Sequence, residues 1–284
     1  PEGAVSGSVN IETKKAADEG NRKIGLGWFS NNRAQGTFDL GQRFGENKEF
    51  GVRANGKLRH GDTPRHGYSE DNKEFALNAD YRGEKLRVAF DSIYAKRKTN
   101  GGRARMQDIQ NLQGGRLFDA PDGKTNLLPS WNWQNTVGQT NMLTFEWDAF
   151  DNAQITGGIG YNKARYYGTL ISPTVCLNAT STCTDAQNTN ASGKVTARNY
   201  DYNTGTARLT DQYFRTLSMN LSARGEFETG PVTHNWSTAF DRVIRQRATT
   251  RGLSAGSSSA KISASGDIAA QLDSFQPDYA TDWE

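Results

Sequence analysis

Apolar and polar residues alternate along most of this chain, beginning with the stretch over residues 34–61. In the first half of that stretch, one side of an extended strand carries Phe38, Leu40 and Phe44, and the other side carries charged residues such as Asp39. After a polar turn, the second half repeats the pattern. The two halves therefore predict a long antiparallel hairpin with one apolar and one charged face.

The same alternation recurs in nine consecutive segments. Each segment has about the 9–11 residues that a tilted strand needs to cross a bilayer. The pattern therefore indicates strands with lipid on one side and a hydrated lumen on the other. The apolar positions are centred near Leu26, Leu40, Val52, Leu77, Phe90, Phe145, Ile159, Leu221 and Phe240.

The connections between the segments alternate in length. Four are tight turns, near Gly45, Gly83, Asp151 and Gly230. Most of the others are long and polar, and they cover residues 61–72, 99–138, 168–207 and 250 to the end, whereas the one near Asn31 is short. Outer-membrane barrels have short periplasmic turns and long extracellular loops. We therefore expect an all-β chain that forms a transmembrane antiparallel β-barrel.

Composition supports this interpretation and excludes other classes. The 284 residues are only 35% hydrophobic, with a mean hydropathy of −0.77, which is low for a soluble globule of this length but suits a barrel with a polar interior. The sequence lacks the roughly 18 consecutive apolar residues of a membrane helix. A net charge of +3, spread along the chain, gives no nucleic-acid footprint.

Few residues offer catalytic or metal chemistry. The spacing of His60, His66 and His234 predicts no metal site, and no nucleophile can be placed beside a base, so we expect neither an enzyme nor a cofactor. Cys176 and Cys183 lie in a polar segment, and their spacing predicts a loop disulfide formed in an oxidising compartment.

The first fifteen residues contain the pattern Gly-x-x-x-Gly-x-Val-Asn-x-x-Thr-Lys, from Gly3 to Lys14. This motif resembles the end of the plug domain of TonB-dependent outer-membrane receptors of the ferric-siderophore type. The stretches FDLGQRFGENKEFGVRANG and DYRGEKLRVAFDS resemble the second to fifth barrel strands of the same family. The resemblance implies a 22-stranded barrel, of which about nine strands are present, preceded by the last strand of a plug. We therefore expect a fragment in which residues 1–20 end the plug and residues 21–284 form the N-terminal part of the barrel.

The resemblance also implies a function, which is TonB-energised uptake of a ferric siderophore or a similar iron chelate through the bacterial outer membrane. The implied partners are the chelate, the TonB complex, outer-membrane lipid and lipopolysaccharide. Aromatic and arginine side chains in the long loops suit an anionic chelate. The candidate ligand-binding residues are Arg103, Arg105, Trp131, Trp133, Tyr200 and Tyr202.

Three alternatives stay open from the sequence. A passive outer-membrane porin would show a steady open channel in planar bilayers. A receptor for haem, cobalamin or an oligosaccharide would share the same scaffold. A secreted β-adhesin or soluble β-sandwich would dissolve in water without detergent.

Overall fold

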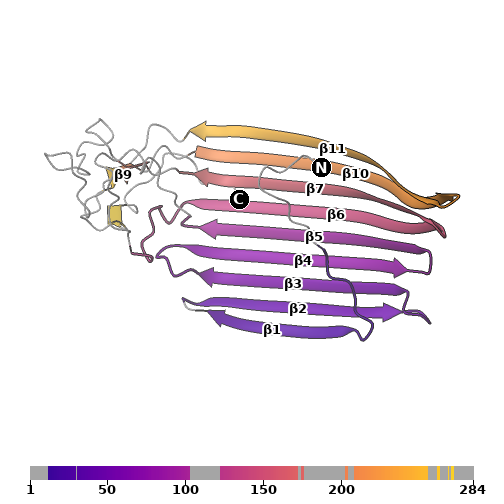
Figure 1. Ribbon diagram of the computed structural model, residues 1–284. Coiled ribbons are helices and arrows are strands. Elements are labelled where there is room, and N and C mark those ends of the chain that lie inside the picture. The colour runs from indigo at the N-terminus through magenta and orange to yellow at the C-terminus, as the bar shows by residue number, and fades with distance from the viewer. Residues whose placement is uncertain are drawn as a thin grey trace.

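The computed structural model describes residues 12–29, 31–102, 122–171, 174–175, 202–203, 208–254, 261–262, 268 and 270–271. Nine long strands form one antiparallel sheet in the order β1-β2-β3-β4-β5-β6-β7-β10-β11 (Figure 1). The strands are β1 (Asn21–Phe29), β2 (Arg33–Phe44), β3 (Phe50–Asp62), β4 (Ser69–Arg82), β5 (Leu86–Asn100), β6 (Trp133–Phe150), β7 (Ala153–Leu170), β10 (Arg208–Thr229) and β11 (Val232–Ser254).

A second, small sheet has three strands of two residues each. They are β8 (Thr174–Val175), β9 (Tyr202–Asn203) and β12 (Lys261–Ile262), with β9 between the other two. None of the helical residues described forms a segment long and apolar enough to cross a membrane.

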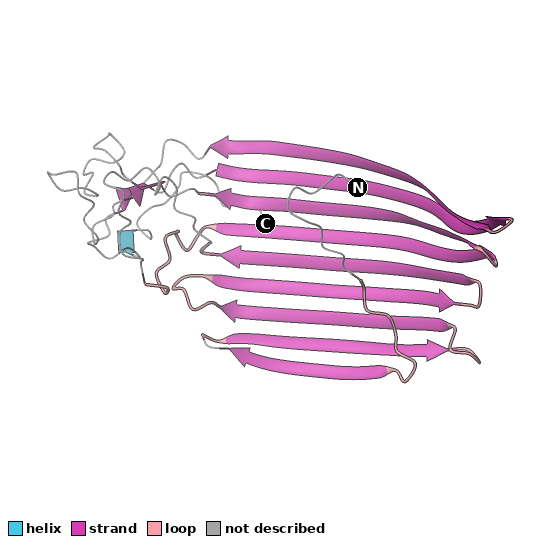
Figure 2. Cartoon of the chain, in the orientation of Figure 1, coloured by secondary structure: helices cyan, strands magenta, loops and turns pink. Residues whose placement is uncertain are grey.

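All nine predicted segments are strands, and each pairs with its sequence neighbours as a meander. The four predicted tight turns join β2 to β3, β4 to β5, β6 to β7 and β10 to β11. They lie together at one end of the sheet, and the strand ends from which the long connections leave lie at the other (Figure 2). We call these ends the tight-turn rim and the long-loop rim. The all-β class and the arrangement expected of an outer-membrane barrel wall are confirmed.

Several strands are longer than the alternation predicts. The β10–β11 ladder runs from Thr229–Val232 to Arg208–Ser254, and β6 begins at Trp133, within the segment expected to be a loop. We call the band of large apolar side chains across the apolar face the apolar belt. Beyond this belt both faces of a strand are polar, so the alternation of apolar and polar residues is lost there although the backbone hydrogen bonds between strands continue. The predicted plug strand near Val9 lies outside the described residues.

The two faces of the sheet differ sharply in accessibility. The apolar face exposes large side chains, with Leu26 90% and Phe240 61% accessible. On the polar face, Arg43 is 5%, Asn78 is 3% and Asp91 is 6% accessible. Such a distribution is unfavourable in water, because apolar area would remain hydrated. It is the distribution expected when lipid covers one face and all backbone polar groups pair within the sheet.

Aromatic rings cover glycines on the apolar face at three places. Phe38 lies opposite Gly56, and a Cβ at Gly56 would lie 2.1 Å from the Phe38 ring. The cross-strand pairs Phe145–Gly157 and Trp236–Gly225 repeat the arrangement, with ring atoms 2.5 Å and 2.9 Å from the corresponding Cβ positions. The glycines therefore let large rings lie flat against the sheet instead of projecting from it.

The apolar face supplies a direct test of membrane insertion. Arginine in place of Leu77, at the middle of the belt, should lower the free energy of unfolding in bilayers by about 2–4 kcal/mol, because a cation at the bilayer midplane is costly. The measurement is urea unfolding of the folded protein in lipid vesicles.

The matched control for Leu77→Arg is Ala76→Arg, one residue away on the polar face, with an expected change within about 1 kcal/mol. A larger loss for Ala76→Arg than for Leu77→Arg would show that the two faces have been assigned the wrong way round.

Candidate functional site

Arg43 is the centre of a buried polar cluster at the tight-turn rim. Its guanidinium pairs with the Asp80 carboxylate at 2.7 Å. It also donates hydrogen bonds to the backbone carbonyl oxygens of Lys48 at 2.6 Å, Glu49 at 3.1 Å and Ala16 at 3.2 Å. One side chain thus joins the β2–β3 turn, strand β4 and the segment that precedes β1. The charge of Arg43 is paired, which buried cations require.

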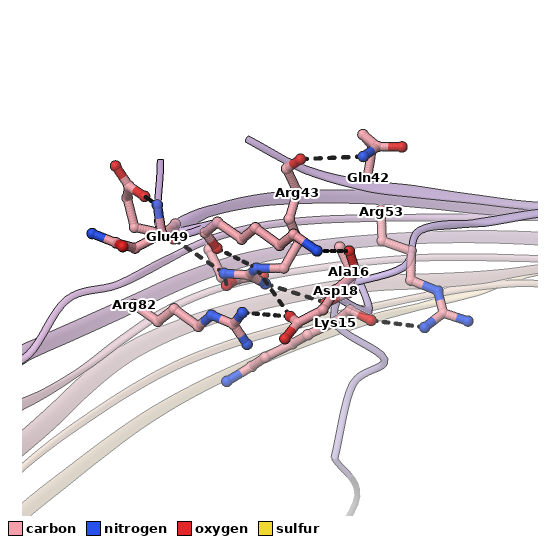
Figure 3. Close-up of polar contacts among 11 residues, drawn as sticks. Lys15, Ala16, Asp18, Gln42, Arg43, Glu49, Arg53 and Arg82 are labelled. Atoms are coloured by element: carbon pink, nitrogen blue, oxygen red, sulfur yellow. Dashed lines mark hydrogen bonds and ion pairs between the residues drawn. The ribbon is translucent and has the colours of Figure 1, made fainter. Parts of the chain in front are cut away.

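The N-terminal segment, residues 12–20, crosses the polar face before it enters β1 (Figure 1). Arg53 donates to the Lys15 carbonyl oxygen at 2.7 Å, and Lys48 donates to the Asp18 carbonyl oxygen at 2.9 Å. The Asp18 carboxylate contacts Arg82 (Figure 3). These contacts fasten the segment mainly through its backbone, so most of them do not depend on its side chains.

Further ion pairs run along the polar face. Arg53 binds Asp39 with two hydrogen bonds of 2.8 Å and 2.7 Å, and Lys57 pairs with Glu74 at 2.7 Å. Arg87 pairs with Asp148 at 2.9 Å and with Glu146 at 3.0 Å. The pairs link neighbouring strands, which gives a hydrophilic wall held in register by cross-strand charges. Two further charged residues of the polar face have hydrogen bonds with neutral partners, since Asn78 donates to Asp91 and Arg224 donates to Gln154.

At the long-loop rim, residues 122–132 pack against the ends of the strands. The backbone N–H of Gly101 donates to the Asn132 carbonyl oxygen at 2.6 Å, and Leu128 is 3% accessible. Gly101 has φ 85°, and a Cβ there would lie 1.7 Å from the Gly67 carbonyl oxygen. Only glycine allows this close approach of two backbones, so the position of this part of the rim depends on Gly101.

Glu70 lies on the polar side of the same rim and was missed by the sequence analysis. Its carboxylate accepts hydrogen bonds from Arg33 at 2.5 Å and from the Tyr68 hydroxyl at 2.5 Å, and it also contacts Arg97. Glu70 occupies a polar position of the β4 alternation, two residues before Asn72. That alternation is a usable signal, but the sequence gives no sign that two arginines from other strands converge there.

The predicted ligand-binding residues are only partly placed. Trp131 is half-buried in the turn before β6. Trp133 is the first residue of β6, and its ring packs edge-to-face on Tyr167 with centroids 5.8 Å apart. The alternation of β6 places Trp133 on the same face as Leu143, which is the apolar face. Tyr202 lies in β9, where its backbone pairs with that of Val175 and Ile262.

The remaining predicted residues lie outside the described part of the chain. They are Arg103, Arg105, Tyr200, Cys176 and Cys183.

Similarity to known proteins agrees with this geometry. The chain is 27% identical over 238 residues to the ferrichrome receptor FcuA of Yersinia enterocolitica, a match that covers 83% of this chain and 28% of that protein. It is 25% identical to BauA, the ferric preacinetobactin receptor of Acinetobacter baumannii, with a TM-score of 0.68 over 88% of this chain and 34% of the other. The chain is similar in sequence and in fold to siderophore receptors of the outer membrane. No protein-family model matches it.

Another solved structure supports the fold alone. The ferric-catecholate import receptor Fiu of Escherichia coli is 16% identical, with a TM-score of 0.63 over 85% of this chain and 34% of Fiu. The chain spans about a third or less of the length of these siderophore receptors. The expected resemblance and the outer-membrane location are confirmed. The similar proteins are transport receptors and not enzymes.

The Arg43–Asp80 pair predicts a large effect on stability. Asp80→Asn should lower the free energy of unfolding by about 3 kcal/mol, because the Arg43 guanidinium, with 2% of its side chain accessible, loses its close counter-charge and keeps only the exposed Asp18 carboxylate at 4.0 Å. The measurement is denaturant unfolding in detergent micelles.

The control is Asp71→Asn, which removes the exposed contact with His60 and should cost less than about 1 kcal/mol. If Asp80→Asn proves as mild as Asp71→Asn, Arg43 does not hold this rim together. The double variant Arg43→Met with Asp80→Leu should regain part of the loss, since no buried charge remains.

Proposed function

We propose that the protein containing this chain binds a ferric siderophore, or a similar iron chelate, at the cell surface and imports it with energy from the TonB complex. The relatives bind ferric siderophores according to their names, which include a ferrichrome receptor and a ferric preacinetobactin receptor. The single observation that carries the proposal is a barrel wall with a hydrophilic inner face, similar in sequence and fold to these receptors over more than four fifths of the chain.

The N-terminal segment supports a plug in the lumen. Residues 15–18 are fastened to the polar face by Arg43, Lys48, Arg53 and Arg82. A chain held at this point enters the barrel from the lumen side. We propose that residues 1–20 end a plug domain and that residues 21–284 belong to the barrel.

The long-loop rim is the proposed entry site for the chelate. We propose that Arg103, Arg105, Trp131, Trp133, Tyr200 and Tyr202 contact the ligand, because aromatic rings bind flat apolar surfaces and arginine neutralises an anionic chelate. Trp131 has the strongest support, since residues 122–132 are packed firmly against the strand ends. Trp133 has less support, because it lies on the apolar face. A disulfide between Cys176 and Cys183 would order the β7–β10 connection.

A passive porin is the alternative mechanism. It requires an open lumen, which is difficult to reconcile with a segment fastened across the polar face. Receptors for haem, cobalamin or oligosaccharides differ in ligand and not in scaffold, and the same uptake experiment distinguishes them.

The uptake experiment uses the full-length protein in a host that lacks its own siderophore receptors. We expect radiolabelled iron to accumulate from one ferric siderophore of a panel, and accumulation to stop when the TonB complex is deleted. Uptake that continues without TonB, together with steady conductance in planar bilayers, would support a porin instead. Uptake of haem or cobalamin alone would reassign the ligand.

Replacement of the rim tryptophans tests the binding site. Trp131→Ala should weaken binding of the transported chelate by about 5- to 100-fold, in the range of buried aromatic contacts at interfaces. Trp133→Ala should have a smaller effect, because its ring packs on Tyr167. The measurement is equilibrium binding by the full-length protein in detergent.

The matched control is Trp236→Ala, at the opposite rim, which should leave affinity unchanged. Unchanged affinity in both rim variants would remove Trp131 and Trp133 from the ligand site.

A further inference from the structure

Arginine side chains outnumber carboxylates on the polar face at the long-loop rim. Arg33 of β2 and Arg97 of β5 both contact Glu70, so two guanidinium groups share one negative charge. Arg59 of β3 lies on the same face and donates a hydrogen bond to the Gln35 side-chain oxygen at 2.8 Å. Within the described ranges no ion pair involves Arg59. The group of Arg33, Arg59, Glu70 and Arg97, which we call the arginine cluster, therefore carries more positive than negative charge.

Strand register brings the arginine cluster together. Arg59 is in register with Asn72 of β4, and Asn72 is in register with Arg97. The backbones of Arg59 and Arg97 are thus two strands apart, roughly 10 Å, which lets both long side chains reach one bound group. The Oδ1 atom of Asn72 and the Nε atoms of Arg33 and Arg97 are buried without a hydrogen-bond partner in the described part of the chain. Buried polar atoms are normally paired, so these strands alone do not satisfy the cluster.

An aromatic ring lies beside the arginine cluster. Phe29 of β1 is in register with Arg33, which places the Phe29 side chain on the polar face. The Arg59 guanidinium lies 5.2 Å from the centroid of this ring, and 43% of Phe29 is accessible. Stacking orients a guanidinium and leaves the N–H groups at its edge able to bind an anion. An exposed ring beside such a cation suits a ligand that carries its negative oxygens on an aromatic ring.

Arg43 and Arg87, at the tight-turn rim, each have their own counter-charge. Arg43 pairs with Asp80 at 2.7 Å, and Arg87 pairs with Asp148 at 2.9 Å. The excess positive charge is therefore not a general property of the polar face. It lies at the rim where the long loops begin, which is the extracellular side of an outer-membrane barrel, and so it faces an arriving ligand.

A further arginine stacks on an aromatic ring farther around the same rim. Arg247 of β11 is in register with Phe214 of β10, and its guanidinium lies 5.4 Å from the centroid of that ring. The alternation of β10 places Phe214 on the same face as Arg224, which is the polar face. Arg247 therefore adds to the positive potential at the long-loop rim.

The charge of an iron chelate depends on its chemical class. A ferric tris-hydroxamate such as ferrichrome is electrically neutral, because its hydroxamate charges cancel the charge of Fe³⁺. A ferric tris-catecholate keeps a negative charge, because each catechol ring loses a second proton when it binds the metal. A cluster with excess positive charge attracts the second class and gives no electrostatic advantage to the first.

We propose that Arg33, Arg59 and Arg97 bind the negative charge of the transported chelate, and that this chelate is an anionic one of the catecholate class. It then differs from ferrichrome, the ligand in the name of the related receptor FcuA. The inference rests on the proposed function, and it adds the class of substrate and a binding surface on the barrel wall below the loops. Phe29 contacts a catecholate ring, and Arg59 binds its oxygens.

The test compares two chelates on the full-length protein in detergent, by equilibrium binding measured through quenching of tryptophan fluorescence. The probes are ferrichrome and a ferric tris-catecholate. We expect the tris-catecholate to bind about 100-fold more tightly at low ionic strength. This ratio should fall when salt is added, because salt screens the attraction between accessible charges.

Arg59 is the residue to replace, because it holds no carboxylate and its loss leaves no buried charge unpaired. Arg59→Gln should weaken tris-catecholate binding by about tenfold, the usual loss for a hydrogen bond to a charged group, and should leave ferrichrome binding unchanged. Arg59→Lys should regain part of the loss, because it restores the charge. The matched control is Arg224→Gln, on the same face at the tight-turn rim, where the arginine is likewise bonded to a glutamine, Gln154. The control should change neither affinity.

A carboxylate of a plug domain is the competing occupant of the arginine cluster. In that case Arg59→Gln would lower the unfolding temperature more than Arg224→Gln does, and would weaken the binding of both chelates alike. That result would overturn the proposal. Tighter binding of ferrichrome than of the tris-catecholate, or a preference that salt does not change, would overturn it too.

Uptake of the same two chelates separates this inference from the proposed function. TonB-dependent uptake of ferrichrome alone would keep the transport proposal and overturn the assignment of an anionic substrate. Iron uptake from neither these chelates nor any other ferric siderophore would overturn the transport proposal, and the assignment with it. We expect TonB-dependent uptake from the tris-catecholate, with a smaller rate for Arg59→Gln than for Arg224→Gln at limiting chelate concentration.

Discussion

The structure depends on one constraint, which is that lipid replaces water against one face of the sheet. Backbone N–H and C=O groups cannot find partners in hydrocarbon, so every strand must be paired along its length. The continuous meander from β1 to β11 satisfies this requirement for the strands between its edges. The same constraint explains why Leu26 and Phe240 are exposed in the isolated chain while Arg43 and Asp91 are buried. The outer edges of β1 and β11 need further strands for the same reason.

The polar face must satisfy a different requirement. Charges inside a barrel wall must be paired, and most of those described here pair with the neighbouring strand, as Arg53 does with Asp39. Arg43 also donates a hydrogen bond to the carbonyl oxygen of Ala16, which lies in the N-terminal segment. The wall therefore serves as a hydrophilic lining and as the anchor of the N-terminal segment.

The tight-turn rim and the long-loop rim have different roles in the structure. At the tight-turn rim, short connections leave little freedom, and the cluster around Arg43 and Asp80 fixes the geometry. At the long-loop rim, Gly101 and Leu128 hold residues 122–132 against the strand ends, which places Trp131 at the proposed ligand entrance.

The sequence by itself determined the strands, their apolar face and the side on which long loops gather. These follow from a period of two and from loop length, both of which are local properties of the chain. Only the tertiary structure decided which charges meet. The convergence of Arg33 and Arg97 on Glu70 and the contact of Arg43 with Ala16 both depend on strand register. Register is set by pairing between distant residues, and it brings together side chains that no local pattern relates.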